Sequence, residues 1–289
     1  MDDQKVSVAV QRIIMANEMS MRYLGSPLYV CISGGKDSSV LQQLAVESGV
    51  PCVFVHSLTT VDAPPTVYFV RKEFDRLSSL GYRCEIRRPD LSMCRLIRKK
   101  KMLPTRQARF CCEYFKKKTV VTDLGYPAFI ATGVRWSESV KRRFRGEFEV
   151  FTKDKQNKVI LTNDNEPDRA LFELCKQKGA RVVNPIIDWG DSDVWDFIHD
   201  RGLPYNPLYD MGFRRVGCVG CPMSSRHEKE KAFRFWPGFR RAYLNACDQL
   251  LRDRKSAGVP PRFDNAQAWF DWWVSGLSIK DWVSSHAKK

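Results

Sequence analysis

The chain has 289 residues and 43% hydrophobic content, enough to bury the core of one large α/β domain with a smaller domain appended. Its formal net charge of +15 favours a polyanionic or heavily phosphorylated partner. No apolar run reaches the length of a membrane span and the N-terminus lacks a signal-peptide pattern, which argues against membrane and secreted classes and predicts a cytoplasmic protein.

Strands and helices alternate along most of the chain. In chain order the pattern predicts a helix over 6–24, a strand over 28–32, a helix over 38–47, a strand over 51–56, a helix over 67–80, and strands over 82–86, 127–132 and 182–183. Such alternation predicts an α/β fold with a doubly wound, mostly parallel sheet that binds ligands at the carboxyl ends of its strands.

Two later segments break this alternation. Turn residues between 146 and 178 predict a hairpin or an insertion before a short helix. From 222 onward, aromatic residues at helical spacing predict a helical cap, in which we expect the tryptophans to serve packing more than base stacking. We therefore expect a nucleotide-binding α/β domain over 1–215 and a Trp-rich helical subdomain over 216–289.

The sequence SGGKDS, Ser33 to Ser38, lies between the first predicted strand and the helix after it. Two glycines there leave bare backbone amides at a helix N-terminus, where an anion is favoured. A Walker A loop needs Ser or Thr directly after Gly-Lys, and this chain has Asp37. The order of residues instead resembles the pyrophosphate loop of ATP pyrophosphatases, which cleave ATP between the α and β phosphates.

This resemblance gives each loop residue a role. Gly34 and Gly35 allow close approach of the backbone, Ser33 and Ser38 offer hydroxyls, Lys36 neutralises the leaving pyrophosphate, and Asp37 orients Lys36 or helps to hold Mg²⁺. The alternative is a plain glycine turn capped by a serine.

The positive charge is concentrated in one segment. Residues 87–145 contain 17 Lys or Arg against four acidic residues, a net charge of +13. This concentration suits the phosphates of a nucleic acid, with binding that weakens as salt rises. Solvated helix faces are the alternative explanation.

The chain has ten cysteines, too few for a disulfide scaffold, and four of them form two pairs. The pairs are Cys111 with Cys112 and Cys218 with Cys221. Four thiolates from two distant segments suit a [4Fe–4S] cluster, whose wide cube adjacent cysteines can grip at two corners; zinc or unmetallated thiols remain open. The other six occur singly, mostly within apolar patterns, and we expect them in the core.

Several motifs together resemble the phosphoadenosine phosphosulfate reductase family. They span about 27–222 and comprise SGGKDS, the Cys-Cys pair followed by Lys116–Lys118, TGVRWSESVKRR from Thr132, NPIIDW from Asn184, DVWDFI from Asp193, and LPYNPLYDMGFRRVGCVGC from Leu203. The resemblance implies an adenine nucleotide α-hydrolase-like fold, ATP or a related nucleotide at the loop, and a [4Fe–4S] cluster on Cys111, Cys112, Cys218 and Cys221. It implies that Arg135, Arg142 and Arg143, with Gly133 at a strand end, face the nucleotide; a solvent-facing ion-pair cluster is the alternative.

One feature departs from that family's reductases, which carry a C-terminal Glu-Cys-Gly motif. The last cysteine here is Cys247, within a helical apolar pattern, so thiosulfonate chemistry lacks an evident nucleophile. We therefore favour the ATP pyrophosphatase branch, with Lys36, Asp37 and Arg135 as catalytic residues and the DNA phosphorothioation proteins of the DndC and SspD type as closest relatives.

This interpretation implies several partners. ATP with Mg²⁺ would adenylate a DNA backbone phosphate held by segment 87–145, and a cysteine desulfurase would provide sulfur through the cluster. A sulfonucleotide reductase, a tRNA thiolase and a non-enzymatic nucleotide sensor remain alternatives, and a homo-oligomer is compatible with the sequence.

Overall fold

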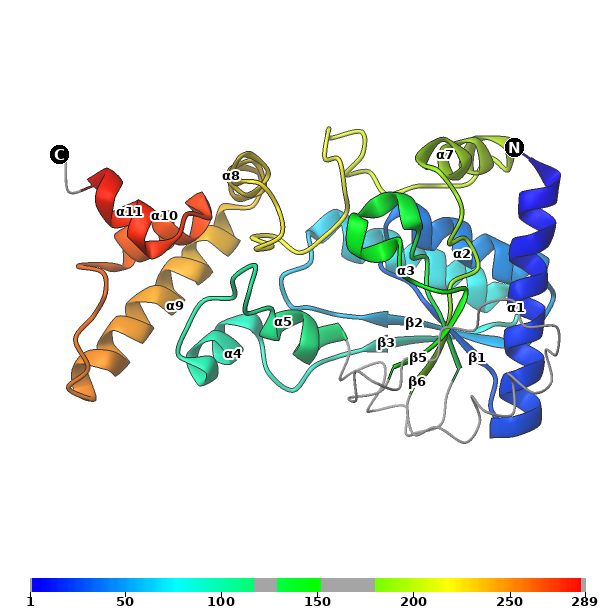
Figure 1. Cartoon of the computed structure of the whole chain (residues 1–289), viewed down its shortest axis with the longest axis horizontal. Coiled ribbons are helices and arrows are strands. Elements are labelled where there is room, and N and C mark those ends of the chain that lie inside the picture. The colour runs from blue at the N-terminus through cyan, green and yellow to red at the C-terminus, as the bar shows by residue number, and fades with distance from the viewer. Residues whose placement is uncertain (1, 117–128, 152–179, 287–289) are drawn as a thin grey trace. The chain divides into compact units, whose positions relative to one another are not determined.

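The computed structural model in Figure 1 describes residues 2–116, 129–151 and 180–286. The chain divides into two compact units, which are taken separately below. The first contains 1–57, 64–87 and 118–216, and the second contains 58–63, 88–117 and 217–289. The second unit thus includes two segments from the first half of the chain, beyond the predicted 216–289.

The first unit is built on a six-stranded sheet with the order β3-β2-β1-β4-β6-β5. Its strands are β1 (Leu28–Cys31), β2 (Cys52–Ser57), β3 (Arg83–Arg87), β4 (Phe129–Ala131), β5 (Phe148–Phe151) and β6 (Ala180–Val183). All neighbouring strands pair in parallel except β5, which is antiparallel to β6. This confirms the predicted mostly parallel α/β fold.

The strand order reverses beside β1. The strands that follow β1 in sequence, β2 and β3, lie on one side of it, and β4 lies on the other. In open parallel sheets, this switch point separates the connections that leave neighbouring strands and creates a crevice at their carboxyl ends. The loop after β1 and the segment after β4 therefore meet at one place.

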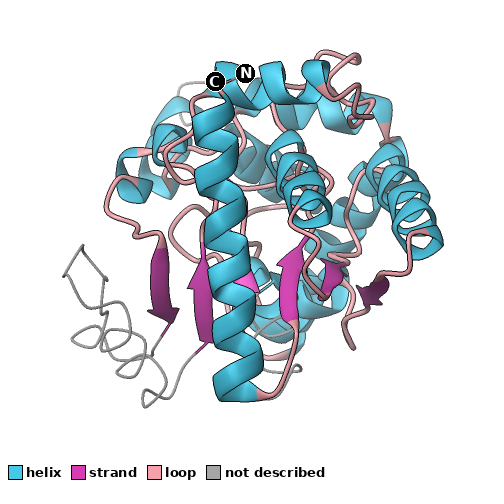
Figure 2. Ribbon diagram, turned by 90° about the vertical axis from the view of Figure 1, so that its right-hand side faces the viewer, coloured by secondary structure: helices cyan, strands magenta, loops and turns pink. Residues whose placement is uncertain are grey.

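Helices of the first unit bury one apolar stripe each. They are α1 (Asp3–Leu24), α2 (Lys36–Glu47), α3 (Pro64–Ser79) and α7 (Asp191–Asp200), with short 3-10 helices η2 (Trp136–Glu138) and η3 (Val140–Arg142). Figure 2 shows α1, the long vertical helix at the centre of the view, in front of the strands. Buried residues such as Ile13, Leu41, Phe54 and Trp189 join helices and strands in one core, which holds the strand ends in fixed positions.

The second unit is helical and rich in aromatic side chains. It contains α4 (Met93–Lys100), α5 (Phe110–Cys112), α8 (Arg226–Phe235), α9 (Pro237–Ser256), α10 (Ala266–Ser275) and α11 (Ile279–His286). Phe233, Tyr243, Phe270 and Trp273 are at most 4% exposed and their rings contact one another. These aromatics therefore form a core, as the sequence predicted, and Cys247 is buried with them.

Two segments differ from the expected pattern. Helix α4 lies near the start of the basic segment, where no helix was predicted, with Ser92 as its N-cap. The expected hairpin over 146–178 begins with β5, and its remainder, 152–179, lies outside the described residues. Among the described helices, none combines the length and the apolar character that crossing a bilayer requires.

Candidate functional site

The loop 33–38 lies at the switch point between β1 and β4 and begins α2. Gly34 adopts φ +77°, a conformation that favours glycine. A Cβ on Gly34 would lie 2.9 Å from the side chain of Thr66 and 3.0 Å from that of Val70, so packing also excludes a side chain there. The buried amide of Asn206 donates to the Gly34 carbonyl oxygen at 2.9 Å and fixes the turn from the other side.

Hydroxyl groups hold the rest of the loop. Ser38 Oγ donates to the Gly35 carbonyl oxygen at 2.8 Å and accepts from the Ser33 amide at 3.2 Å, and the Ser33 and Ser38 hydroxyls lie 3.1 Å apart. The Lys36 amide donates to the Tyr209 hydroxyl at 3.0 Å. Gly35 is the N-cap of α2, and because glycine has no side chain it cannot accept a hydrogen bond from the first turn. The Tyr209 hydroxyl therefore accepts from the first backbone amide of this 12-residue helix instead.

The segment after β4 approaches this helix end closely. A Cβ on Gly133 would lie 2.9 Å from the Asp37 carbonyl oxygen and 3.3 Å from the Ser38 amide nitrogen. These are backbone atoms that cannot rotate away, so only glycine allows this approach. Gly133, predicted to face the nucleotide, thus lies in direct backbone contact with the loop.

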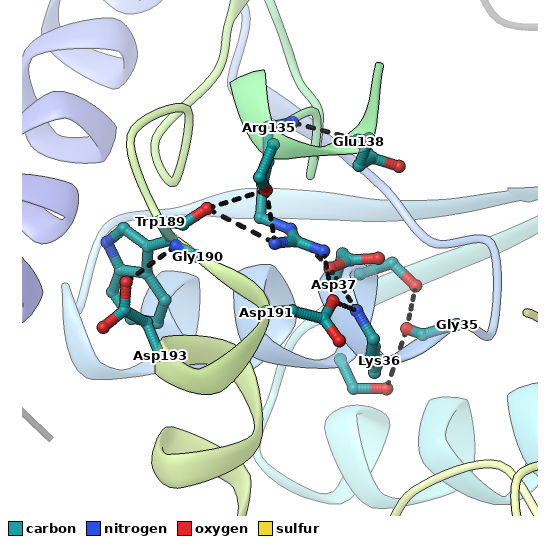
Figure 3. A network of polar contacts seen from close by, with 12 residues as sticks. Gly35, Lys36, Asp37, Arg135, Glu138, Trp189, Gly190, Asp191 and Asp193 are labelled. Carbon is teal, nitrogen blue, oxygen red and sulfur yellow. Dashed lines mark hydrogen bonds and ion pairs between the residues drawn. The ribbon is translucent and has the colours of Figure 1, made fainter. Parts of the chain in front are cut away.

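Two cations and two carboxylates meet beside the loop (Figure 3). Lys36 Nζ lies 2.6 Å from Asp191 Oδ1 and 3.1 Å from Asp37 Oδ1. Arg135 bridges the same two carboxylates, with Nε 2.7 Å from Asp37 Oδ1 and Nη2 2.9 Å from Asp191 Oδ1. The Lys36 and Arg135 side chains are 9% and 3% exposed, whereas that of Asp191 is 68% exposed. Both cations are thus buried in the first unit, whereas the Asp191 carboxylate faces solvent.

The hydrogen bond from Lys36 lowers the pKa of Asp191, burial opposes this shift, and Arg135 adds to it. Asp191 therefore stays ionised and neutralises the two buried cations. Around it, Arg135 Nη1 donates to Ser137 Oγ at 2.8 Å and to the Trp189 carbonyl oxygen at 3.3 Å, which fixes the guanidinium plane. Because the carboxylates already satisfy the cations, an incoming anion must compete with them.

Three residues of this site escaped the sequence analysis: Asp191, Asn206 and Tyr209. All lie more than 150 residues from the loop that they contact. Asp191 begins α7 and lies between NPIIDW and DVWDFI, so no motif contained it. Asn206 and Tyr209 lie in LPYNPLYD, a motif that did not indicate which of its side chains turn to the loop.

The predicted arginines differ in their positions. The pKa of Arg142 is lowered by burial and by Arg145, Arg215 and Arg135, while Asp37 acts in the opposite direction, which places Arg142 near the loop. Arg142 also forms an ion pair with Glu138. Arg143 is exposed, and no hydrogen bond or ion pair joins it to the loop within the described ranges. Its assignment to the nucleotide therefore stays a prediction.

The four paired cysteines lie together in the second unit as free thiols. A hydrogen bond to Cys112 and then burial raise the pKa of Cys111, with a further contribution from Cys218. Burial raises the pKa of Cys218 to about 11, and its Sγ lies 3.3 Å from Thr59 Oγ1. Four thiols are the donor set of an iron–sulfur cluster.

The geometry is not that of a closed mononuclear site. Over 2–116, 129–151 and 180–286, no three or more His, Cys, Asp or Glu side chains are arranged so that they could hold a metal ion. Four thiols have the donor chemistry of a [4Fe–4S] cluster, but this arrangement supports neither a cluster nor a single zinc ion, so metal ligation by these cysteines stays a prediction.

Comparisons with known proteins agree with the motifs. The family model described as the phosphoadenosine phosphosulfate reductase domain matches residues 27–224. An adenosine 5'-phosphosulfate reductase from Allochromatium vinosum is 29% identical over 135 residues, which are 46% of this chain and 43% of that protein. An uncharacterized 37.8 kDa protein of Escherichia phage 186 is 26% identical over 262 residues, with 72% of this chain and 70% of that protein covered.

Among solved structures, the phosphoadenylyl-sulfate reductase from Candida auris has a TM-score of 0.45 at 16% identity, covering 75% of this chain and 96% of that one. The chain spans less than half the length of the first curated relatives that it matches.

Proposed function

The chain belongs to the phosphoadenosine phosphosulfate reductase domain family, and from this premise we propose that it is an AMP-forming ATP pyrophosphatase serving sulfur incorporation into the DNA backbone. Loop 33–38 binds the phosphates of ATP in this proposal. The proposed bond cleavage rests on the side chains around that loop, and the proposed acceptor rests on the charge of segment 87–145.

The observation that carries the proposal is the pairing of two buried cations with two carboxylates at the start of α2. The Lys36 ammonium and Arg135 guanidinium suit the charge that develops on leaving pyrophosphate. The Asp37 and Asp191 carboxylates are hard oxygen ligands, of the kind that Mg²⁺ takes when it binds through a nucleotide triphosphate. A site for a magnesium nucleotide needs both kinds of group.

The proposed reaction has two substitutions. A non-bridging oxygen of a DNA phosphate attacks the α-phosphorus of ATP, a P–O bond forms, and pyrophosphate leaves with the electron pair of the α–β bridge. A hydrosulfide-level sulfur then attacks the activated DNA phosphorus, and AMP leaves. Sulfur keeps its oxidation state in this substitution. A cysteine desulfurase delivers sulfur as a persulfide, so its release as hydrosulfide takes two electrons from a thiol reductant, which is oxidised to a disulfide. The net charge of +13 over 87–145 favours DNA as the acceptor, and a cysteine desulfurase is the proposed sulfur source.

Cys111, Cys112, Cys218 and Cys221 would hold a [4Fe–4S] cluster in this proposal. Their free thiols, their place in one unit and their mutual influence support it. When bound, such a cluster supplies soft iron sites that accept sulfur ligands. The neighbouring Lys116, whose pKa is raised chiefly by Cys218, offers a positive charge to the thiolates.

Reduction of a sulfonucleotide is the second candidate, and the names of the curated relatives favour it. Adenosine 5'-phosphosulfate reductases from two organisms are 29% and 30% identical to about half of this chain. The same loop cations suit a sulfate ester as well as a phosphate. The two candidates differ in their products, so one experiment separates them.

The test uses anaerobically purified full-length protein with its iron and sulfide content measured. Incubation with MgATP, DNA and a sulfide source should yield AMP and pyrophosphate, identified by mass. Lys36→Ala should lower the rate about 100- to 1,000-fold, as the loss of one oxyanion donor does. Lys5→Ala is the matched control, because Lys5 belongs to the same unit but pairs with Asp193 at 2.7 Å. Unchanged turnover in Lys36→Ala would refute the proposal, and sulfite release from a sulfonucleotide with a thiol donor would favour the second candidate.

A further inference from the structure

Residues 136–145, hereafter the aromatic-basic segment, directly follow Arg135 and expose apolar side chains among basic ones. The Phe144 residue is 75% exposed, Val140 is 68% exposed and Trp136 is 37% exposed. The basic members of the segment are Lys141, Arg142, Arg143 and Arg145. Phe144 contacts no other ring among the described residues. Large apolar groups on a surface with this charge point to a partner that offers both phosphates and flat apolar faces.

The segment is held in place by its own hydrogen bonds. Trp136 donates from its indole Nε1 to the Arg145 carbonyl oxygen at 2.8 Å and from its amide to the Ile187 carbonyl oxygen at 2.8 Å. The Arg135 amide donates to Glu138 at 3.0 Å, which ties the start of η2 to the nucleotide site. Phe144 therefore lies on a turn that hydrogen bonds hold in place. A ligand that binds its ring loses little conformational entropy in ordering that turn.

Positive charge is crowded next to this ring. Burial lowers the pKa of Arg142, and the neighbouring Arg145, Arg215 and Arg135 lower it further. Arg142 pairs with Glu138 and Arg145 pairs with Glu149, so a phosphate that binds Arg142 competes with the Glu138 carboxylate. Arg135, one of the cations that act on Arg142, also pairs with Asp37 and Asp191, so the aromatic-basic segment lies beside the loop.

We propose that the aromatic-basic segment binds a single-stranded stretch of nucleic acid, with one base stacked on Phe144 and backbone phosphates on Arg142 and Arg143. Stacking on an exposed ring needs an unstacked base, which a duplex interior does not offer. A purely ionic duplex contact would leave Phe144 without a use, and an apolar protein patch would not need four cations. This inference rests on the proposed nucleic-acid acceptor and narrows it to an unpaired strand.

The experiment measures the anisotropy of a labelled single strand and of the same sequence as a duplex, over a range of salt concentrations. Phe144→Ala should weaken single-strand binding roughly 5- to 100-fold, and Phe144→Tyr should restore it, because stacking needs the ring. Phe144→Leu keeps apolar area without a π-face and should bind as weakly as the alanine variant. Thermal unfolding of each variant confirms that it is folded.

Arg143→Ala should lower the slope of log K against log salt by about 0.7, the value for one phosphate contact on a single strand. Arg22→Ala, an exposed arginine in the last turn of α1, is the charge control and should leave the slope unchanged. Equal binding of Phe144→Leu and wild type, or tighter binding of the duplex, would overturn the inference while the proposed function stands. Failure of wild type to bind any nucleic acid would instead refute the nucleic-acid acceptor itself, and capture of an acidic peptide by Phe144 would assign the segment to a protein partner.

Discussion

Replacing Asp191 by Asn should make the loop bind metal-free pyrophosphate more tightly. The carboxylate lies 2.6 Å from Lys36 Nζ and 2.9 Å from Arg135 Nη2, and its side chain is 68% exposed, so it can be changed with little loss of packing. Its removal shifts the charge of the four-residue network from neutral to +1. A unit charge about 5 Å from an anion, at an effective dielectric of about 40–80, is worth roughly 0.8–1.7 kcal/mol, which is about a 4- to 17-fold gain in affinity.

The assay is calorimetric titration with pyrophosphate in EDTA and with MgATP in excess Mg²⁺. In EDTA the Asp191→Asn protein should bind more tightly than wild type, and with Mg²⁺ it should bind more weakly because one oxygen ligand is lost. Asp193→Asn is the control, since Asp193 lies on the same helix but pairs with Lys5 and the Gly190 amide. Weaker or unchanged pyrophosphate binding in EDTA by a folded Asp191→Asn protein would refute the placement of phosphate beside Lys36.

Two further predictions concern stability. Gly133→Ala should destabilise the protein by about 1–3 kcal/mol, because the added Cβ overpacks against the Asp37 carbonyl oxygen. A lower Tm measures this loss. Gly238→Ala is the control and should not lower the Tm, because nothing lies within 4 Å of its added Cβ. Burial lowers the pKa of Lys229 to about 8 from 10.5, so between these pH values the unfolded chain binds a proton that the folded chain lacks. Stability of wild type relative to Lys229→Met should therefore rise with pH in that window by at most about 1.4 kcal/mol per pH unit. Urea unfolding at several pH values measures this, and a constant difference would contradict the shift.

Much of the fold follows from short-range patterns. The apolar runs that became β1, β2 and β3 are bounded by turn residues, and the strand–loop–helix order around SGGKDS leaves few alternatives. Helix α4 was missed because its segment carries consecutive cations, which read as a solvated surface, while Leu96 and Ile97 are buried on its other face. Strand β5 was hidden for a similar reason: it is short, and only its antiparallel pairing with β6 defines it.

The site was predictable only in its local half. Lys36, Asp37 and Arg135 were identified because SGGKDS and TGVRWSESVKRR resemble motifs of a known family. Asp191 and Tyr209 contact the loop from more than 150 residues away. Local sequence patterns do not show which distant segments the fold brings together. An acidic residue in a first helical turn is common, so nothing local distinguished Asp191 from an ordinary capping residue.

The charge network gives a physical reason why this loop should prefer a magnesium nucleotide to a bare anion. In the free protein, Asp37 and Asp191 neutralise the buried Lys36 and Arg135. A phosphate that arrives alone takes the cations and leaves two carboxylates unpaired beside it, at a cost. A phosphate that arrives with Mg²⁺ lets the carboxylates turn to the metal while the cations turn to the phosphate. No charge is left unpaired in either state, and the exposed Asp191 is the group with freedom to make this exchange.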